Sequence, residues 1–536
     1  MKLKMNLIVL VVLIQNIFVF SQEIKPKRYL FSEMTKAIDK SKVEYLIIDE
    51  QSANLFSRPQ NLSQFKNLKE LNLDDYGHII DISSLANQKK LETLLTYKHL
   101  EQLPKIVKLK NLKNLTLYNC NLTSISKKIG KLKKIETLDL RNCNLKTVPR
   151  GIKNLKRLKT IDLGQNTQLK NFKSLRKMSS IEKIRLRRVD LYKIPKEFST
   201  LKKLKSLEFY YSKNLRDFTN LKYLTQLENL SIVSCNTKEL PKEFIYLTSL
   251  KKLIITDDSL TNISNIKECI NIESLSIPSL DIKSIPKELA DLRKLKELNI
   301  SFNENLIDFT NFKHLTELEK LDMDYCNLKA IPNELSKLKQ LKSLSIGDAE
   351  LTEFSSLENL TKIEYLSLSN CEDIYNIPNE ILHLENLKEL SLGSMKNLRN
   401  YSGLNQLKEL EEISLYSLPI LKLPEDLIQL KKLKKLYLSN NENMNDYSVL
   451  TSLYNLEELE IHDLEYLMLP DEVYQIKNLR KLKFLYYKGA IDFNALKMMP
   501  NLEEIYLDYL NYSDLLEIEK IKKKYPSLNI IALGMG

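Results

Sequence analysis

A six-residue pattern recurs along almost the whole chain and constrains its fold more than any other feature. The segment 112–117 (LKNLTL) is one copy of this L-x-x-L-x-L pattern. Twenty copies begin between Leu68 and Leu502 at intervals of 21 to 24 residues, and 43–48 (VEYLII) fits as an earlier one. Positions four and six of each copy fall on one side of a short strand, and one such strand cannot bury its apolar face alone. Successive copies are therefore expected to stack as parallel strands around a continuous core.

The pattern resembles the leucine-rich-repeat superfamily over nearly all of the chain that follows its N-terminal segment. The resemblance implies an α/β leucine-rich-repeat solenoid, a curved horseshoe with a parallel β-sheet on its concave side and short helices or turns on its convex side. We expect a signal peptide at 1–21, an N-terminal cap with a short helix at 22–42, about 21 repeats at 43–511, and a C-terminal cap at 512–536 that contains a helix and a last strand.

Two types of repeat alternate with a period of about 46 residues. One type has an I-P-x-E-L-like turn, as at 194–198 and 285–289, and resembles the typical 23-residue class. A Pro at the first helical position followed by Glu favours a short helix. The other type has D-F-T-N-L or a similar run, as at 217–221, and resembles the shorter repeats of bacterial internalins. There we expect a Thr or Ser to cap the convex turn.

The second position of the pattern alternates in charge without a break. From Lys69 to Glu503, a Lys or Arg in one repeat is always followed by a Glu in the next. Adjacent strands lie about 5 Å apart, so each charge should lie between two opposite ones. An exposed pair adds only a few tenths of a kcal/mol, but the alternation also disfavours a shift by one repeat, which would bring like charges together. Duplication of a 46-residue ancestor is the simpler origin of the same pattern.

The ninth position holds Cys or Asn in many repeats, where the superfamily places such residues facing the interior of a turn. These residues are Cys120, Cys143, Asn166, Cys235, Asn303, Cys326, Cys371 and Asn441. We expect buried thiols and amides that satisfy backbone groups. A disulfide between Cys120 and Cys143, on adjacent repeats, is the alternative, since an exported protein can form one. Cys269 lies outside this column and is expected to be buried.

The N-terminal segment has the features of a secretory signal. Lys2 and Lys4 precede an apolar run from Leu7 to Phe20, and cleavage is expected after Ser21. An uncleaved membrane anchor is the alternative, although the run is shorter than the roughly 20 apolar residues that a span needs. We therefore expect an exported chain, secreted, periplasmic or on the cell surface, with no integral membrane segment after cleavage.

Charge and motifs argue against several classes of function. The net charge of +13 permits a nucleic-acid partner, but the Lys residues are spread through the repeats among Glu residues, so no nucleic-acid binding is expected. The chain has no Gly-rich phosphate loop, no H-E-x-x-H motif and no Cys pair at zinc-ligand spacing. We predict neither catalytic nor metal-binding residues, no cofactor, and a protein that is not an enzyme.

Positions five, seven and eight are expected to point outward on the concave sheet and to form the binding surface. Aromatic side chains there are Tyr118, Tyr210, Tyr211, Phe302, Tyr325, Tyr416, Tyr437, Tyr486 and Tyr506. A basic area contains Arg141, Arg185, Arg187 and Arg188, and a smaller acidic one contains Asp322 and Asp324. Tyr is common at interfaces because it buries much area at a small loss of entropy, although β-propensity alone also places it in strands.

The sequence thus predicts an exported scaffold that binds a protein partner on its concave sheet, in adhesion or recognition. A column of serines at position five, which includes Ser345, Ser367, Ser391 and Ser414, would leave a flat groove suited to an extended polypeptide or a helix. A glycan or cell-wall binder is the first alternative, because aromatic side chains also bind sugars. An enzyme inhibitor is the second. For any single patch, a solvated surface without a partner stays open.

Overall fold

A computed structural model describes 29–30, 39–48, 62–73, 85–97, 103–120, 127–257, 260–371, 374–441, 443–462, 469–485, 495–507, 525 and 528–532. The expected signal peptide lies outside the described residues. The chain divides into two compact units. Unit 1 comprises Met1–Asp190 and Thr200–Leu204, and unit 2 comprises Leu191–Ser199 and Lys205–Gly536.

The described part of unit 1 contains parallel strands that pair in the order of the sequence. They are β1 (Tyr29–Leu30), β2 (Tyr45–Ile47), β3 (Glu70–Asn72), β4 (Thr93–Thr96), β5 (Asn114–Leu117), β6 (Thr137–Asp139), β7 (Thr160–Asp162) and β8 (Lys183–Arg187). Short 3₁₀-helices connect them at Lys40–Lys42, Leu62–Gln64, Leu103–Lys108, Lys128–Lys131, Arg150–Asn154 and Lys173–Leu175.

Unit 2 continues the same arrangement with strands that again pair in parallel with their sequence neighbours. They are β9 (Ser206–Tyr210), β10 (Asn229–Val233), β11 (Lys252–Thr256), β12 (Ser274–Ser276), β13 (Glu297–Asn299), β14 (Lys320–Asp322), β15 (Ser343–Gly347), β16 (Tyr365–Ser369), β17 (Glu389–Gly393), β18 (Glu412–Tyr416), β19 (Lys435–Ser439), β20 (Glu458–His462), β21 (Lys481–Leu485), β22 (Glu504–Leu507) and β23 (Asn529–Ala532).

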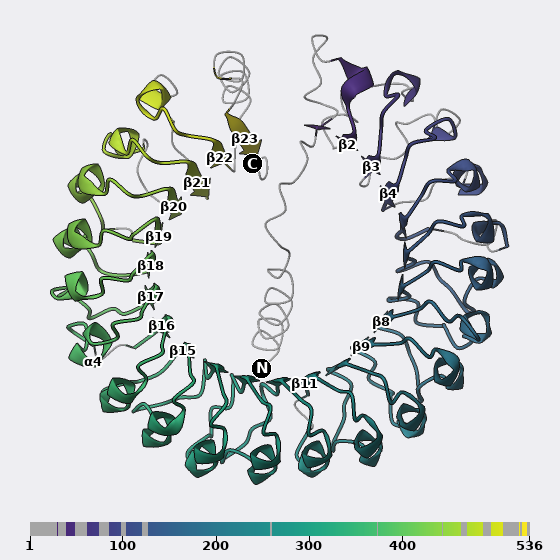
Figure 1. Ribbon diagram of the computed structural model, residues 1–536, viewed down its shortest axis with the longest axis horizontal. Helices are drawn as coiled ribbons and strands as arrows, with labels where there is room; N and C mark the ends of the chain where they lie inside the picture. The colour runs from purple at the N-terminus through teal and green to yellow at the C-terminus, as the bar shows by residue number, and fades with distance from the viewer. Residues whose placement is uncertain are drawn as a thin grey trace. The chain divides into compact units, whose positions relative to one another are not determined.

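The return segments of unit 2 are also single helical turns. All but one are 3₁₀-helices, and α4 (Asn379–Leu382) is the described α-helix. The 3₁₀-helices span Lys196–Thr200, Thr219–Tyr223, Lys242–Tyr246, Ser264–Glu268, Lys287–Asp291, Thr310–His314, Asn333–Lys337, Ser355–Asn359, Leu404–Gln406, Glu425–Gln429, Ser448–Ser452, Val473–Gln475 and Ala495–Met498. In Figure 1 the strands of each unit line the inner side of its curve and the helical turns line the outer side, as expected.

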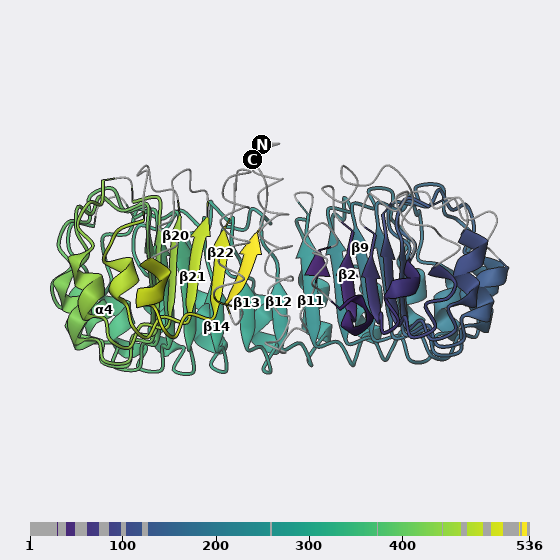
Figure 2. The ribbon, with the colours of Figure 1, turned by 90° about the horizontal axis from the view of Figure 1, so that it is seen from above.

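The core lies between the sheet and the helical turns and is formed by the repeated apolar positions. In β17, Leu390 and Leu392 are buried, as is Leu387 just before the strand. Leu390 pairs in register with Leu366 of β16 and with Ile413 of β18. Each buried side chain of this size contributes about 1.5–3 kcal/mol, so the ladder of inward residues stabilises the stack of strands. Figure 2 shows β20, β21 and β22 side by side with parallel directions.

The charge alternation at position two forms the expected ladder of ion pairs. In unit 1, Lys113 Nζ lies 2.8 Å from Glu92. In unit 2, Glu319 lies between two lysines, 3.1 Å from Lys296 and 2.7 Å from Lys342. Hydrogen bonds from both lysines hold the pKa of Glu319 below its usual value. The side chains are about one-third to one-half exposed, so each pair adds little alone.

The residue at position eight leaves the strand in a left-handed conformation in repeat after repeat. Its φ is 56° in Asn142, 57° in Tyr211 and 58° in Tyr325. The N–H of this residue donates to the carbonyl of position seven in the next repeat, as from Tyr325 to Gly347 at 2.7 Å. The chain can therefore add one more hydrogen bond to the ladder while it turns away from the sheet. Bulky side chains rarely adopt this conformation, and the repeat imposes it on them.

The 46-residue period appears as a second set of parallel bridges beside the helical turns. Single bridges join Lys193 to Asp217, Ser284 to Asp308 and Lys422 to Asp446, always from a Pro-containing repeat to the one after it. We expected a Thr or Ser side chain to cap the convex turn, and this was wrong, because an Asp carboxylate accepts the hydrogen bond there instead. The carboxylate of Asp217 accepts the N–H of Thr219 at 2.9 Å, because the Asp side chain reaches back over the turn. The prolines precede the helical turns as N-caps rather than occupying their first residue, as in Pro286 before Lys287–Asp291.

The structure confirms part of the expected C-terminal cap and differs from the expected N-terminal cap. At the N-terminal end, β1 is a strand that the sequence did not predict, and only Lys40–Lys42 of the expected helix is described, as a 3₁₀-helix. At the C-terminal end, the expected last strand is present as β23 beside β22, whereas the expected helix lies outside the described residues. No helix in the described part of the chain is long and apolar enough to cross a membrane.

Candidate functional site

The outward-facing side of the sheet is where the chain departs most from its own repeat. Positions four and six hold a Leu or Ile in most strands and are buried. Position five, on the opposite side, changes from strand to strand, from Asp162 in β7 to Ile254 in β11, Ser367 in β16 and Tyr437 in β19. Because the fold does not require these changes, the outward face is the candidate functional site.

In unit 1, this face has an Arg held by two carboxylates. Arg141 makes paired hydrogen bonds to Asp139, with Nη2 2.6 Å and Nε 2.9 Å from Oδ2. Its Nε also lies 3.7 Å from Asp162, and its guanidinium lies over the ring of Tyr118 at 5.5 Å. The centroid of the Tyr97 ring lies 6.0 Å from that of the Tyr118 ring. Arg141 is therefore held in place by two carboxylates and an aromatic ring, and its charge is offset within the fold.

The other basic residues of unit 1 lie on β8 or directly after it. Arg185 pairs in register with Asp162. Burial and the nearby Asp139 raise the pKa of Asp162 to about 6, although Arg141 and Arg185 oppose that increase. Arg187 ends β8, and Arg188 follows it in the left-handed conformation with an exposed side chain. The basic surface of this unit is thus concentrated on β8.

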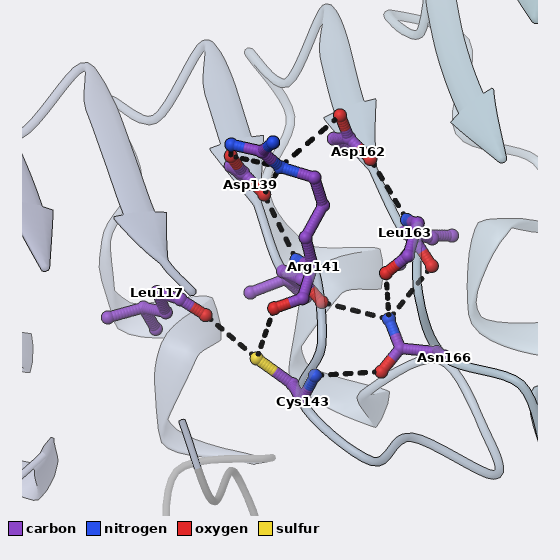
Figure 3. Close-up of polar contacts among 9 residues, drawn as sticks. Leu117, Asp139, Arg141, Cys143, Asp162, Leu163 and Asn166 are labelled. Atoms are coloured by element: carbon purple, nitrogen blue, oxygen red, sulfur yellow. Dashed lines mark hydrogen bonds and ion pairs between the residues drawn. The ribbon is translucent and has the colours of Figure 1, made fainter. Parts of the chain in front are cut away.

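Beneath Arg141, the ninth-position residues bind backbone groups as predicted (Figure 3). Asn166 Oδ1 accepts the N–H groups of Cys143 and Leu145, each at 3.0 Å. Asn166 Nδ2 donates to the carbonyls of Leu140 and Leu163 at 2.9 and 2.8 Å. The Cys143 thiol donates to the Leu117 carbonyl at 2.7 Å. All six cysteines are buried thiols outside any disulfide, including the pair considered for one.

At the start of unit 2, the outward face is aromatic and apolar. Tyr210 ends β9, and Tyr211 follows it with a left-handed backbone. Beside them the outward positions hold Val233 at the end of β10 and Ile254 within β11. Sequence reasoning missed these two apolar residues because it searched the outward columns for aromatic and charged side chains. Their alternation with the inward Leu253 and Ile255 was the available signal.

Further along unit 2, two aromatic rings stack beside the predicted acidic pair. Phe302 and Tyr325 lie parallel, 4.5 Å between centroids with an interplanar angle of 6°. Both are position-eight residues, with φ near 60°. Asp322 accepts hydrogen bonds from Ser301 at 2.5 Å and from Asn299 at 2.8 Å. The structure thus places these four predicted residues together on β13 and β14 and the turns that follow.

Asp324 is the more exposed carboxylate of this pair. Its Oδ1 accepts the hydroxyl of Ser345 at 2.8 Å, and the backbone N–H of Gly347 is a further donor. Burial, together with the negative charge of Asp322, raises the pKa of Asp324 to about 6. Within the described part of the chain, no Lys, Arg or His lies within ion-pair distance of Asp324.

The Tyr416 ring lies over the neighbouring strand β17, and the charge of Asp324 acts on its hydroxyl. The ring covers Gly393 so closely that a Cβ atom there would overlap ring atoms Cε1, Cζ and Cε2. The hydroxyl hydrogen-bonds to Ser369, which is two strands away from Tyr416. Asp324 Oδ1 similarly approaches Gly347, 3.1 Å from where a Cβ would lie. Two of the chain's ten glycines therefore make room for outward side chains of neighbouring strands.

Towards the C-terminal end, charged side chains fill the outward face. Lys483 lies 2.6 Å from Glu460 and 2.9 Å from Glu458. Burial alone would raise the pKa of Glu460, but hydrogen bonds from His462 and Lys483 lower it to about 2. Lys483 also lies 5.7 Å from the ring centroid of Tyr437. The aromatic and charged residues here are bound to one another.

Tyr506 also contacts a lysine and a glutamate of the sheet. Lys481 lies 5.0 Å from the centroid of the Tyr506 ring, and the Tyr506 hydroxyl donates to Glu504 at 3.0 Å. Tyr486 lies outside the described residues. No group of three or more His, Cys, Asp or Glu side chains suited to a metal ion occurs within the residues that the structure describes.

One hollow lies on the rim beside the ladder rather than on the outward face. It has a volume of about 840 Å³ and is open and polar, with Lys434, Arg480 and Glu457 among its lining residues. These charges already pair with one another, as Arg480 does with Glu503 at 2.8 Å. The charged groups that line this hollow are thus largely engaged with one another.

The parallel strands, single helical turns and buried ninth-position residues define a solenoid of leucine-rich repeats. Residues 50–221 match the family model described as "Leucine-rich repeat region". The same repeat continues through unit 2 to β22. The chain thus has the leucine-rich-repeat solenoid fold, a scaffold typical of protein recognition, and residues 50–221 match the family itself.

Several solved structures resemble the chain at low identity. A leucine-rich-repeat protein of Leptospira interrogans is 26% identical, with 81% of this chain and 100% of that chain covered and a TM-score of 0.46. An internalin of Listeria monocytogenes is 21% identical, with 58% and 82% covered and a TM-score of 0.38. The ectodomain of a plant receptor kinase from Arabidopsis thaliana is 20% identical, with 84% and 62% covered and a TM-score of 0.36. No curated protein matches the chain.

Proposed function

We propose that this chain is an exported scaffold that binds a protein partner on the outward face of its parallel sheet. One observation carries the proposal. The residues that the fold requires are repeated at positions one, two, four and six, whereas the chemically diverse residues gather at the outward positions of the strands. The outward columns hold half-buried aromatic residues, Tyr210, Phe302, Tyr437 and Tyr506. Aromatic side chains that stay partly exposed are enriched where a partner covers them.

The environments of the tyrosines favour a protein partner over a glycan. Sugars stack on open aromatic faces, but Arg141 lies over Tyr118, Lys483 over Tyr437 and Lys481 over Tyr506. Such rings present a mixed aromatic and charged surface, which is typical of protein interfaces, where Arg and Tyr are enriched. The glycan or cell-wall binder is therefore the weaker hypothesis, whereas an enzyme inhibitor is one kind of protein binder that the same surface would suit.

Export is part of the proposal and is supported by the N-terminal sequence alone. Two lysines and an apolar run from Leu7 to Phe20 precede Ser21, the pattern of a cleaved secretory signal. N-terminal sequencing of the protein recovered outside the cytoplasm should begin at Gln22. A chain that keeps Met1 and stays inside the cell would contradict this part of the proposal.

Partner capture with matched surface variants tests the binding function. The purified chain is immobilised and exposed to proteins from the medium or the cell surface, and bound proteins are quantified by mass spectrometry. A specific partner should be lost when Tyr210→Ala and Tyr211→Ala are combined, and retained in Tyr454→Ala, which alters a 70% exposed Tyr in the turn after Ser448–Ser452. Recovery of nothing above background, or equal loss in both variants, would contradict the proposal.

A further inference from the structure

One part of the outward face in unit 2 differs in charge from the protein as a whole. We name it the acidic strip and define it as the outward positions three, five and seven of the repeats that contain β14 to β18. Four of these positions hold carboxylates, Asp322, Asp324, Glu389 and Glu412, and one holds a lysine, Lys320. The chain itself has a net charge of +13, so the strip is a local reversal of sign.

The floor of the strip is shallow because its residues are small. Seven of the eight residues at positions five and seven of β15 to β18 are small, and the eighth is Tyr416. The small ones are Ser345, Gly347, Ser367, Ser369, Ser391, Gly393 and Ser414. Register pairing places the four position-five serines opposite one another on adjacent strands. This row runs across the strands at about 4.8 Å per strand, so three steps between four serines extend about 14 Å, enough for an extended segment of four to five residues.

Aromatic side chains line this floor. Phe302 and Tyr325 stack at one end beside the two aspartates. Tyr416 lies flat over Gly393 with its hydroxyl on Ser369. Tyr365 hydrogen-bonds to Ser367, and the charges of Asp324 and Asp322 act on its hydroxyl. Rings and carboxylates therefore lie on the same part of the outward face, an arrangement that attracts cations through both charge and the ring faces.

The carboxylates of the strip are only partly neutralised by the protein. Glu412 has Lys435 at 2.9 Å, whereas Asp324 accepts hydrogen bonds only from neutral donors among the described residues. Burial, together with the charge of Glu412, raises the pKa of Glu389. Negative charges held close together and partly buried are unfavourable until a cation joins them. The outward face elsewhere in unit 2 has its own cations, such as Lys481 and Lys483 beside Glu458.

We infer that the acidic strip binds a basic, extended segment of the partner polypeptide, with an arginine side chain placed between Asp324 and the rings of Tyr325 and Tyr416. The inference rests on the proposed function and specifies its partner chemistry. A guanidinium is planar, can donate two hydrogen bonds to one carboxylate, and stacks on aromatic rings. Within the floor, Ser345, Ser367 and Ser369 hydrogen-bond to Asp324, Tyr365 and Tyr416. The hydroxyls of Ser391 and Ser414 are the ones that can bind the peptide backbone.

A defined peptide tests the inference without knowledge of the natural partner. The probe is a fluorescent seven-residue peptide of Gly and Ser with Arg at two alternate positions, and the matched peptide has Glu in place of Arg. Anisotropy titration of the full chain should give at least about tenfold tighter binding of the Arg peptide. The combined variant Asp324→Asn and Glu389→Gln should lower affinity for the Arg peptide about tenfold or more. Glu425→Gln, at a 71% exposed carboxylate on Glu425–Gln429, should leave it unchanged.

Ser367→Lys provides a second variant that does not depend on removing an acid. It puts a cation into the centre of the floor and should also reduce binding of the Arg peptide, while thermal unfolding by circular dichroism shows that the variant folds. Equal binding of the Arg and Glu peptides would overturn the inference, as would unchanged affinity in both strip variants. If a captured partner depends on Tyr210 and Tyr211 but not on the strip, the proposed function stands and this inference fails. If no partner depends on the outward face at all, the proposed function itself fails.

Discussion

The ring of Tyr416 lies directly over Gly393, the residue opposite it on the neighbouring strand β17. Any side chain at residue 393 would occupy the space of the ring. The contact shows that the outward face is shaped by pairs of residues on adjacent strands as well as by single columns. It also gives the acidic strip a large side chain that lies flat over its floor.

Gly393→Ala should displace Tyr416 and open that part of the strip. We expect the free energy of unfolding to fall by about 1–3 kcal/mol, as in other substitutions that overfill a packed site. Affinity for the Arg peptide should also fall several-fold, because one wall of its site moves. Urea unfolding and peptide titration measure the two effects. Glu425→Gln, at an exposed carboxylate on Glu425–Gln429, is the control and should change neither by much, and equal effects in the two variants would contradict this account.

The hydrogen bonds of Asn166 predict a large effect for a single buried amide. Asn166→Leu would leave the N–H groups of Cys143 and Leu145 and the carbonyls of Leu140 and Leu163 without this partner. Unfolding by urea should show a loss of about 3 kcal/mol or more, since each buried unsatisfied group costs about 1–3 kcal/mol.

The matched comparison for Asn166 is another residue of the same column. Cys371→Ala removes a thiol with weak hydrogen bonds, one to the Ser369 carbonyl at 3.5 Å and one with the backbone of Leu351. We expect its loss to be about 1 kcal/mol, from the lost apolar burial of one small group. If Asn166→Leu were no more destabilising than Cys371→Ala, the amide would not have the structural role assigned to it.

The ion-pair ladder should respond to the sign of a charge more than to its removal. Glu319→Gln removes two exposed pairs and should lower the free energy of unfolding by less than about 1 kcal/mol. Glu319→Lys would put three positive charges in a row with Lys296 and Lys342, and we expect a larger loss that decreases as salt is added. Denaturation at low and high ionic strength tests this, and an effect insensitive to salt would be evidence against the ladder.

Asp162 should make the stability of unit 1 depend on pH. Its folded-state pKa is raised to about 6, first by burial and then by Asp139, against opposing effects of Arg141 and Arg185. In the unfolded chain the pKa is about 3.9, so the folded state binds the proton more tightly between these values. The stabilising contribution of this proton is complete below pH 4 and is lost as the pH rises through 6.

Asp162→Asn isolates that effect by difference. Relative to the unmodified chain, the variant should gain stability between pH 4 and pH 7, by at most about 3 kcal/mol for a shift of two units. Thermal or urea unfolding at matched pH values measures it, with Asp217→Asn on an exposed turn as the control for removal of a carboxylate elsewhere. A difference that does not change with pH would contradict the raised pKa.

Much of the fold could be predicted because each structural requirement repeats. The inward leucines, the charge alternation and the ninth-position Cys and Asn residues recur at fixed spacing, and stacking is the arrangement that satisfies all three. The left-handed backbone at position eight was not predictable, because Tyr211, Phe302 and Tyr325 are poor residues for it. There the hydrogen bond to the next repeat overrides local preference.

The candidate site was predictable as a set of columns but not as a set of contacts. The sequence places Arg141 among basic residues, yet Asp139, two positions away on the same side of one strand, pairs with it. Tyr416 could be assigned to the outward face, but its position over Gly393 depends on a pair of strands and on a glycine at one position. Side-chain direction across strands is set by neighbours in space, and the repeat pattern does not encode it.

Site-specific photo-crosslinking tests the central claim, that the outward face binds a partner, most directly. A benzophenone amino acid is placed at Tyr437, on the outward face of β19, or at Tyr454, 17 residues later and away from the sheet. With a captured partner or the Arg peptide present, irradiation should give covalent adducts from Tyr437 and few from Tyr454. Adducts from Tyr454 alone, or in equal yield from both positions, would show that the sheet does not bind the partner.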